Sequence, residues 1–130
     1  MLKRVQASLR TRTDQALGQR GLTTPQYAVL AALEREAGIS NAELARRAFV
    51  TPQTMVRIVE TLEARGLVSR HPHPSHGRIR PASLTPRGAR LVAGCHAVVV
   101  GMEQRMLADL GPEQRRQLLD LLVTCAVALG

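Results

Sequence analysis

The apolar residues of this 130-residue chain recur every three or four positions over most of its length. This spacing lines up apolar side chains on one face of an α-helix, so it predicts a mainly α fold. Only the stretch from about 67 to 85 has strand character instead. The predicted helices span approximately residues 4–18, 25–37, 41–47, 52–65, 86–109 and 112–129.

Short polar motifs mark where several of these helices begin and end. A threonine followed by proline supplies a capping hydroxyl and a residue suited to the first helical turn. Ser40, with Glu43 three residues later, has the sequence pattern of a capping box. Gly66 is placed to end a helix in the left-handed conformation. The Thr-Pro pairs are Thr24-Pro25, Thr51-Pro52 and Thr85-Pro86.

The middle of the chain combines a helix-turn-helix spacing with a hairpin. The helices over 41–47 and 52–65 are joined by about four residues, as in a helix-turn-helix. Two segments with strand character, LVSRH and IRPASLT, then flank the segment PHPSHGR. Proline, histidine, serine and glycine in that segment predict the tip of a two-stranded hairpin. A helix-turn-helix followed by a basic hairpin predicts a winged helix, in which the hairpin is the wing.

The helix over 52–65 has one apolar face and one face of unusual composition. Met55, Val59 and Leu62 fall in a row that predicts burial against the rest of the lobe. In the first two turns, the side chains that point the other way include no acidic group. Together with the capping Thr51, these outward residues are Gln53, Thr54, Val56 and Arg57.

Those outward side chains suit the edges of base pairs in the major groove of DNA. Gln53 can form two hydrogen bonds to adenine, and Arg57 can fork onto guanine or hold a phosphate. Thr54 can bond a base or a phosphate, and Val56 offers an apolar contact for a thymine methyl group. A single exposed valine is also common on protein surfaces, so its role stays open at this point.

The net charge of the chain is concentrated around the same region. Of the formal charge of +8, residues 40–90 supply +6, from nine arginines and three glutamates. Such an excess favours a polyanionic partner, here double-stranded DNA. Arg78 and Arg80 flank the hairpin tip and can enter a narrow minor groove, with Arg78 favoured. Weaker candidates for phosphate contacts are Ser40, Arg47 and Arg70.

The last helix is apolar on nearly all sides from Leu118 to Leu129. A helix at the surface of a monomer needs only one apolar face, so this pattern predicts cover from a second copy of the chain. Burial within one subunit is the alternative. We therefore expect a single domain over 1–130, with a winged helix-turn-helix lobe at about 22–85 and dimerisation helices at about 1–20 and 86–130.

Three segments carry a resemblance to a known family: GLTTPQYAVLAAL, NAELARRAFVTPQTMVRIVETLEARGLVSR and GRIRPASLTPRGARL. They contain, in order, Leu-Thr-x-x-Gln, Glu-Leu-Ala, Leu-Glu-x-x-Gly-Leu-Val-x-Arg and Leu-Thr-x-x-Gly. Each motif alone is weak evidence for a family, but the order and spacing of the four motifs together are specific. Over nearly the whole chain the sequence resembles a MarR-type transcriptional regulator.

This resemblance implies a homodimer whose first, fifth and sixth helices interleave. It implies binding to a short palindrome in promoter DNA, usually to repress, and release by a small aromatic or phenolic ligand in the crevice between lobe and dimer region. The family's wing arginine corresponds to Arg78. The family usually has aspartate two residues earlier, where this chain has His76, and its first helix is usually longer.

Histidine and cysteine suggest weaker hypotheses. His71, His73 and His76 cluster in the hairpin, but their spacing fits no structural zinc motif, so no metal or cofactor is predicted. Protonation of these histidines near pH 6 would add positive charge beside DNA, which predicts tighter operator binding as the pH falls from about 7.5 to 6. Cys95 and Cys125 lie on apolar helical faces, where packing is favoured over redox sensing.

Other classes of protein fit the sequence less well. No nucleophile elbow, phosphate-binding loop or zinc-protease motif is present, so an enzyme is not expected. No signal peptide or long apolar run is present, which favours the cytoplasm and no membrane partner. Only two aromatic residues occur, which disfavours a binder that stacks single-stranded bases. The main alternative is a winged-helix module that binds protein partners and not DNA.

Overall fold

The computed structural model describes residues 1–70 and 81–130. The described part is mostly helical with one small antiparallel hairpin, which confirms the predicted fold class. Most helix bounds agree with those predicted, but the fifth helix ends earlier, at Met106 and not near 109. In chain order the elements are α1 (Leu2–Gly18), α2 (Thr24–Arg35), α3 (Asn41–Ala48), α4 (Pro52–Ala64), β1 (Val68–Arg70), β2 (Ala82–Leu84), α5 (Pro86–Met106) and α6 (Pro112–Leu129).

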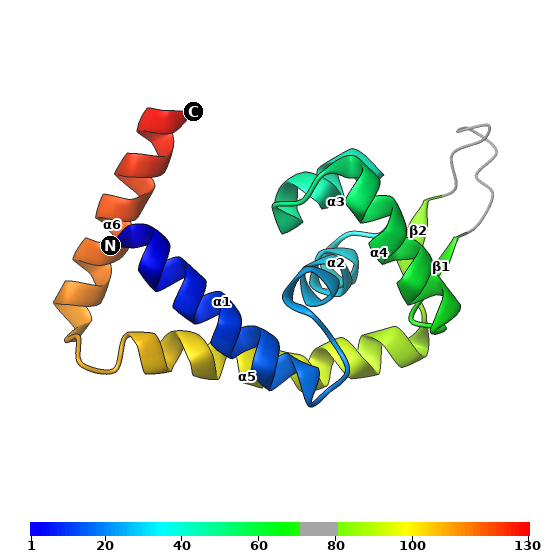
Figure 1. Cartoon of the computed structure of the whole chain (residues 1–130), viewed down its shortest axis with the longest axis horizontal. Helices are drawn as coiled ribbons and strands as arrows, with labels where there is room; N and C mark the ends of the chain where they lie inside the picture. The colour runs from blue at the N-terminus through cyan, green and yellow to red at the C-terminus, as the bar shows by residue number, and fades with distance from the viewer. Residues whose placement is uncertain (71–80) are drawn as a thin grey trace.

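Helix α5 is the long support on which the other elements are arranged (Figure 1). Helix α1 packs along it, and α2 packs against it from the lobe. Helices α2, α3 and α4 contact one another, and the hairpin joins α4 to the beginning of α5. At the end of α5 that is far from the lobe the chain turns, and α6 stands at a steep angle to α5 (Figure 1).

The lobe closes over a single aliphatic core. Leu30, Met55, Leu62 and Val92 have no exposed surface, and they come from α2, α4 and α5. Leu17 at the end of α1 is also fully buried in this cluster, so α1 is fixed to the lobe. Because the apolar row of α4 packs into this core, the opposite face of α4 must point outward.

The two strands form the base of the wing. Val68 pairs with Leu84, Ser69 with Ser83 and Arg70 with Ala82. The hairpin is tied to the lobe by the Gly38 amide, which donates to the Ala82 carbonyl oxygen (3.0 Å), and Gly38 has a φ of +77° that suits glycine.

Capping follows the predicted pattern with two corrections. Thr51 and Thr85 cap α4 and α5 as predicted, and Gly66 has a φ of +71°. The cap of α2 is Thr23 and not Thr24. The Thr23 hydroxyl accepts a hydrogen bond from the Gln26 amide, and the Gln26 side-chain oxygen accepts one from the Thr23 amide.

The predicted capping box of α3 forms only in half. The Ser40 hydroxyl accepts a hydrogen bond from the Glu43 amide at 3.2 Å. The Glu43 carboxylate, however, bonds Arg46 and Arg47 and does not turn back to the Ser40 amide. Two charged donors on the next turn of the helix hold this carboxylate more strongly than one neutral backbone donor would.

Helix α6 contains no buried residue in the single chain. Leu119, Leu121 and Val127 are 61%, 64% and 75% exposed. Cys95 is buried in the core as predicted, but Cys125, for which packing was also predicted, is exposed in the single chain. The apolar face of α6 therefore has no cover within the part of the chain that the structure describes.

Candidate nucleic-acid interface

The turn between α3 and α4 fixes the angle at which α4 is presented. Phe49 ends α3 in the left-handed conformation, with a φ of +56°. Its amide bonds the last carbonyl groups of α3, and the Val50 amide donates to the Ala45 carbonyl oxygen at 3.1 Å. The Asn41 side chain at the start of α3 donates to the Pro52 carbonyl oxygen at 3.1 Å. These bonds clamp the start of α4 to both ends of α3.

The predicted outward residues of α4 all lie on its exposed face. Thr51, Gln53, Thr54 and Arg57 are exposed, and Val56 is 40% exposed. The Thr51 hydroxyl caps the helix through the Thr54 amide (3.2 Å) and donates to the Thr54 hydroxyl (3.0 Å). The Thr54 hydroxyl proton therefore remains available to an outside acceptor. The first turn of α4 has no acidic residue that would repel a phosphate.

The weaker phosphate candidates are already engaged within the chain. The Ser40 hydroxyl caps α3. Arg47 donates to Glu43 at 2.8 Å and reaches Glu36 at 3.5 Å. Arg70 lies 3.6 Å from Glu63. These contacts place Arg47 and Arg70 on the lobe surface but reduce the positive charge that each offers to a partner.

Glu43 is held strongly in its ionised form. Hydrogen bonds from Arg46 first, and then from Arg47, lower the pKa of its carboxyl to about 2 from the usual 4.5. Arg46 donates twice to this carboxylate, at 2.9 and 2.6 Å. The three side chains form a charged cluster on the outer surface of α3, next to the turn that leads to α4. The predicted wing residues Arg78 and Arg80, and the hairpin histidines, lie outside the described residues.

A crevice of about 440 Å³ lies between the lobe and the long helices. Residues of α1 and α5 form one side, and residues of α2 and the end of α3 form the other. Phe49, a residue that is 90% exposed, lines this crevice. The lining residues are Gln6, Leu9, Arg10, Thr13, Thr24, Pro25, Tyr27, Ala28, Arg47, Ala48, Phe49, Val99 and Glu103.

Three polar side chains form a row beside this crevice. The Tyr27 hydroxyl oxygen lies 2.7 Å from Nδ1 of His96, and Nε2 of His96 lies 2.8 Å from a carboxylate oxygen of Glu34. The Tyr27 and His96 rings meet edge to face, with centroids 5.7 Å apart. Burial raises the pKa of Tyr27, and the nearby Cys95 and Glu34 act in the same direction. The row links α2 to α5.

Sequence reasoning missed several of these residues. An asparagine in the first turn of α3 was a signal for the Asn41 bond, because its amide can reach a neighbouring backbone group. Nothing in the local sequence marks Phe49 as left-handed, or pairs Tyr27 with His96, which stands 69 residues later. Such a pairing depends on how α2 crosses α5.

The described part of the chain offers little for thiol reactivity, metal binding or membrane insertion. Burial raises the pKa of the Cys95 thiol, which lowers its reactivity. Residues 1–70 and 81–130 contain no group of three histidine, cysteine or acidic side chains placed to hold a metal ion. Among the helices of the described residues, none is both long and apolar enough to cross a membrane.

Comparison with known proteins settles the family. A model described as MarR family matches residues 20–79. The HTH-type transcriptional repressor Rv2887 of Mycobacterium tuberculosis is 44% identical over 117 residues, which cover 90% of this chain and 84% of that protein. The chain belongs to the MarR family.

Solved structures of a MarR-family relative have the same fold. The crystal structure of Rv2887 of M. tuberculosis in complex with salicylic acid matches with a TM-score of 0.80 and 42% identity, over 95% of this chain and 92% of that one. The structure of Rv2887 in complex with DNA matches with a TM-score of 0.75 and 39% identity, over 95% and 93% of the two chains.

Proposed function

We propose that this MarR-family protein is a homodimeric, sequence-specific DNA-binding repressor that a small phenolic ligand releases from its operator. It acts by binding and not by catalysis, as the description of its relative as a transcriptional repressor supports. The observation that carries the proposal is the outward face of α4. That face combines an amide, a hydroxyl, a partly exposed valine and an arginine on a helix whose other side is fully committed to the core.

Helix α4 is proposed to lie in the major groove of DNA. Gln53 and Arg57 have the donors to read adenine and guanine, and Val56 can contact a thymine methyl group. Thr51 and Thr54 stand at the helix N-terminus, where backbone amides and the helix dipole favour a phosphate. Arg78 and Arg80 of the wing are proposed to contact the neighbouring minor groove. Ser40, Arg47 and Arg70 are proposed as secondary phosphate contacts, weakened by their internal partners.

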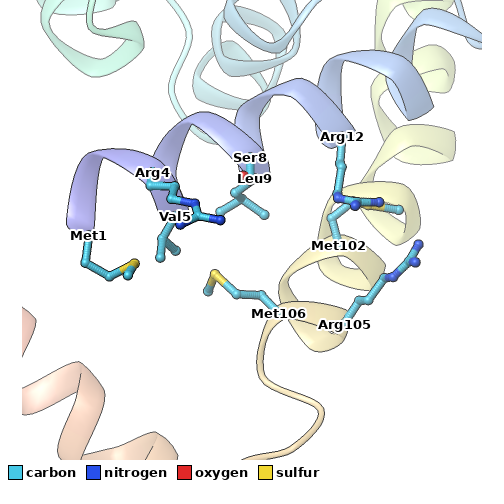
Figure 2. A pocket seen from close by; sticks show the side chains of 9 residues that line it. All are labelled: Met1, Arg4, Val5, Ser8, Leu9, Arg12, Met102, Arg105 and Met106. Carbon is cyan, nitrogen blue, oxygen red and sulfur yellow. The ribbon is translucent and has the colours of Figure 1, made fainter.

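The dimer is proposed to form through α1, α5 and α6. A groove of about 380 Å³ lies between the first half of α1 and the end of α5, and Figure 2 shows Met1, Val5 and Met106 extending into it. Helix α6 supplies a second uncovered apolar surface in the same part of the molecule. Two apolar surfaces on one subunit are each satisfied when a second copy covers them. A two-fold dimer places two α4 helices on half-sites about one turn of DNA apart, roughly 10 bp.

The ligand is proposed to enter the crevice between the lobe and the long helices. Rv2887 forms a complex with salicylic acid, and the crevice here offers arginine for a carboxylate and Phe49 for an aromatic ring. Phe49 and Ala48 end α3, which is clamped to α4 by the bonds described above. A ligand wedged against them would move the α3–α4 pair relative to α1 and α5. The distance between the two α4 helices would then no longer match the operator, and DNA would be released.

The test of this proposal is selection of DNA fragments by the purified protein, followed by mobility shift on the selected sequence. We expect a palindrome, and we expect salicylate to weaken the complex. Arg57→Ala should cost about 1–3 kcal/mol and relax the preference at one base pair if Arg57 reads a base. Arg116→Ala on α6 removes the same charge far from α4 and is the matched control, with light scattering to verify that its dimer is intact. Selection of no common sequence, with equal binding by Arg57→Ala, would favour a winged helix that binds protein partners instead.

A further inference from the structure

The row of Tyr27, His96 and Glu34 lies where the packed part of α5 gives way to the crevice. One turn before His96, Val92 has no exposed surface and belongs to the lobe core. One turn after His96, Val99 lines the crevice. The side chains of His96 and Glu34 are each 38% exposed. The row therefore joins α2 to α5 at the edge of the crevice, between a closed region and an open one.

Two hydrogen bonds join His96 of α5 to two different turns of α2. Tyr27 and Glu34 are seven residues apart, which places them on one face of α2 with a rise of about 10 Å between them. The Tyr27 hydroxyl oxygen lies 2.7 Å from Nδ1 of His96, and a Glu34 carboxylate oxygen lies 2.8 Å from Nε2. Because the two bonds leave one ring in different directions, a slide or rotation of α2 against α5 would lengthen at least one of them.

Both bonds can form in either protonation state of His96. An ionised carboxylate only accepts hydrogen bonds, so Nε2 carries a proton and donates it to Glu34. In a neutral imidazole Nδ1 accepts the proton of the Tyr27 hydroxyl, and in an imidazolium Nδ1 donates to the hydroxyl oxygen. The edge-to-face contact of the two rings, with centroids 5.7 Å apart, supports the same arrangement. The row therefore joins the two helices whether or not His96 is charged.

The other polar joints between the lobe and the long helices lie near the end of α1. Arg65, at the end of α4, donates to the Gly21 carbonyl oxygen at 2.7 Å. Asp14 of α1 accepts a hydrogen bond from the Thr24 amide at 2.9 Å. These bonds keep the lobe attached to α1. The aliphatic core resists separation of the helices, but apolar contacts are not directional and hold an angle less strictly than hydrogen bonds do. Loss of the row would therefore leave the lobe attached but less restrained against α5.

We propose that Tyr27, Glu34 and His96 are positioning residues that fix the angle between the winged lobe and α5, and so set the spacing of the half-sites that the protein accepts. The lobe carries α4, and α5 is one of the proposed dimerisation helices. The angle at this joint thus determines the separation of the two α4 helices in a dimer. The three side chains act through α4 and need not touch DNA. This inference rests on the proposed function, which supplies the dimer and the operator.

The angle itself is measured without DNA, as the distance between two spin labels in pulsed electron paramagnetic resonance. The labels are attached at Glu60→Cys on α4 and Gln104→Cys on α5, two exposed positions outside the row. The background is Cys125→Ser, because Cys125 is exposed and the buried Cys95 is protected from labelling. Labelled protein is diluted with unlabelled protein, so that the measured distance lies within one chain in any oligomeric state.

Four variants of the row test its role in this distance. We expect one narrow distribution when the row is intact, and a broader one in Tyr27→Phe, Glu34→Ala and His96→Phe. Glu34→Gln is the matched control, because its amide oxygen still accepts from Nε2 of His96 and should keep the distribution narrow. In a His96→Phe background, Tyr27→Phe should broaden the distribution no further, because the row is already lost.

The consequence for recognition is measured by mobility shift on three DNA duplexes. These are the palindrome that selection yields and two versions with one base pair inserted or removed at its centre, which turns one half-site by roughly 35°. To bind an altered duplex the wild type must break the row. The ratio of its affinities for the selected and altered duplexes therefore includes the value of that row. The ratio should fall by roughly twofold to tenfold in Tyr27→Phe and Glu34→Ala, the value of one net hydrogen bond, and should be kept in Glu34→Gln.

A variant that is only less stable would bind all three duplexes more weakly by the same factor, so the ratio separates positioning from folding. The inference is overturned by a distance distribution that stays narrow in Tyr27→Phe and Glu34→Ala, or by an affinity ratio that stays unchanged in them. It is also overturned if Glu34→Gln behaves like Glu34→Ala. If selection yields no common sequence, the proposed DNA function fails, and the distances alone decide whether the row fixes the lobe.

Discussion

Replacement of Gly88 by alanine should loosen the joint between the wing and α5. Gly88 is buried in the first turn of α5, and its amide donates to the capping hydroxyl of Thr85 at 3.0 Å. A Cβ atom added at this position would lie 2.1 Å from the Leu67 carbonyl oxygen and 3.0 Å from the Leu67 carbonyl carbon. Leu67 immediately precedes β1, so the clash falls on the base of the hairpin.

The size of the effect follows from these distances. Because real Cβ contacts below 3.0 Å essentially never occur, the Leu67 oxygen must retreat by at least 3.0 − 2.1, or about 0.9 Å. That oxygen accepts the Thr85 amide at 3.2 Å, so its retreat also breaks a hydrogen bond. Overpacking costs about 1–3 kcal/mol and the lost bond about 0.5–1.5 kcal/mol, while alanine in a helix returns about 1 kcal/mol. The net destabilisation of Gly88→Ala is therefore roughly 0.5–3.5 kcal/mol.

The measurement is unfolding in urea at equal protein concentration for the wild type and both glycine variants. Gly101→Ala is the matched control, because it lies in the same helix and a Cβ there meets nothing within 4 Å. We expect Gly88→Ala to unfold at lower urea and Gly101→Ala to unfold at the same or higher urea. Operator affinity should fall in Gly88→Ala, since the hairpin base moves. If Gly88→Ala is as stable as the wild type, the backbone contact that we describe is wrong.

Three further predictions concern charge, thiol chemistry and assembly. Because the folded protein lowers the pKa of Glu43 to about 2, its ionised form stabilises the fold above pH 4.5, and that contribution is lost as the pH falls from 4.5 towards 2. Stability of Glu43→Gln should therefore change less than wild-type stability between pH 5 and 2, measured by urea unfolding. In Cys125→Ser, the buried Cys95 should react slowly with iodoacetamide at pH 8 and quickly in denaturant, as mass spectrometry would show; rapid labelling of the folded protein would contradict its burial. Leu121→Asp, at a position 64% exposed in one chain, should convert the dimer to monomers in light scattering, whereas an unchanged mass would exclude α6 from the interface.

Much of the lobe could be predicted because its signals are local. The apolar row of α4 and the capping hydroxyls of Thr51 and Thr85 each depend on residues within one or two turns, and the structure confirms them. The exposed face of α4 followed from the same pattern, since residues that do not fit the buried row must point away. Their contacts with bases remain predictions.

Features that depend on two distant segments could not be predicted. The crevice exists because α1 and α5 stand beside the end of α3. The spacing of apolar residues along one helix does not tell how far that helix lies from another. The Tyr27–His96 contact joins residues 69 apart. The capping box of α3 failed because Glu43 had better partners on its own helix than the pattern assumed. The sequence offered Arg47 and Arg70 as phosphate contacts, but in the structure Glu36 pairs with Arg47 and Glu63 with Arg70.

The uncovered state of α6 has a consequence for regulation. Most of the stability of a helix in a protein comes from packing of its apolar face, and α6 has no buried residue in the single chain, so a lone subunit has little to keep this segment folded. In the proposed dimer, ordering of the segment and pairing of subunits are one event, and the amount of competent protein rises with the square of the subunit concentration when pairs are scarce. Occupancy of a promoter then responds to the number of copies in the cell more steeply than simple binding allows. A cell could therefore switch off repression by dilution alone, without any ligand.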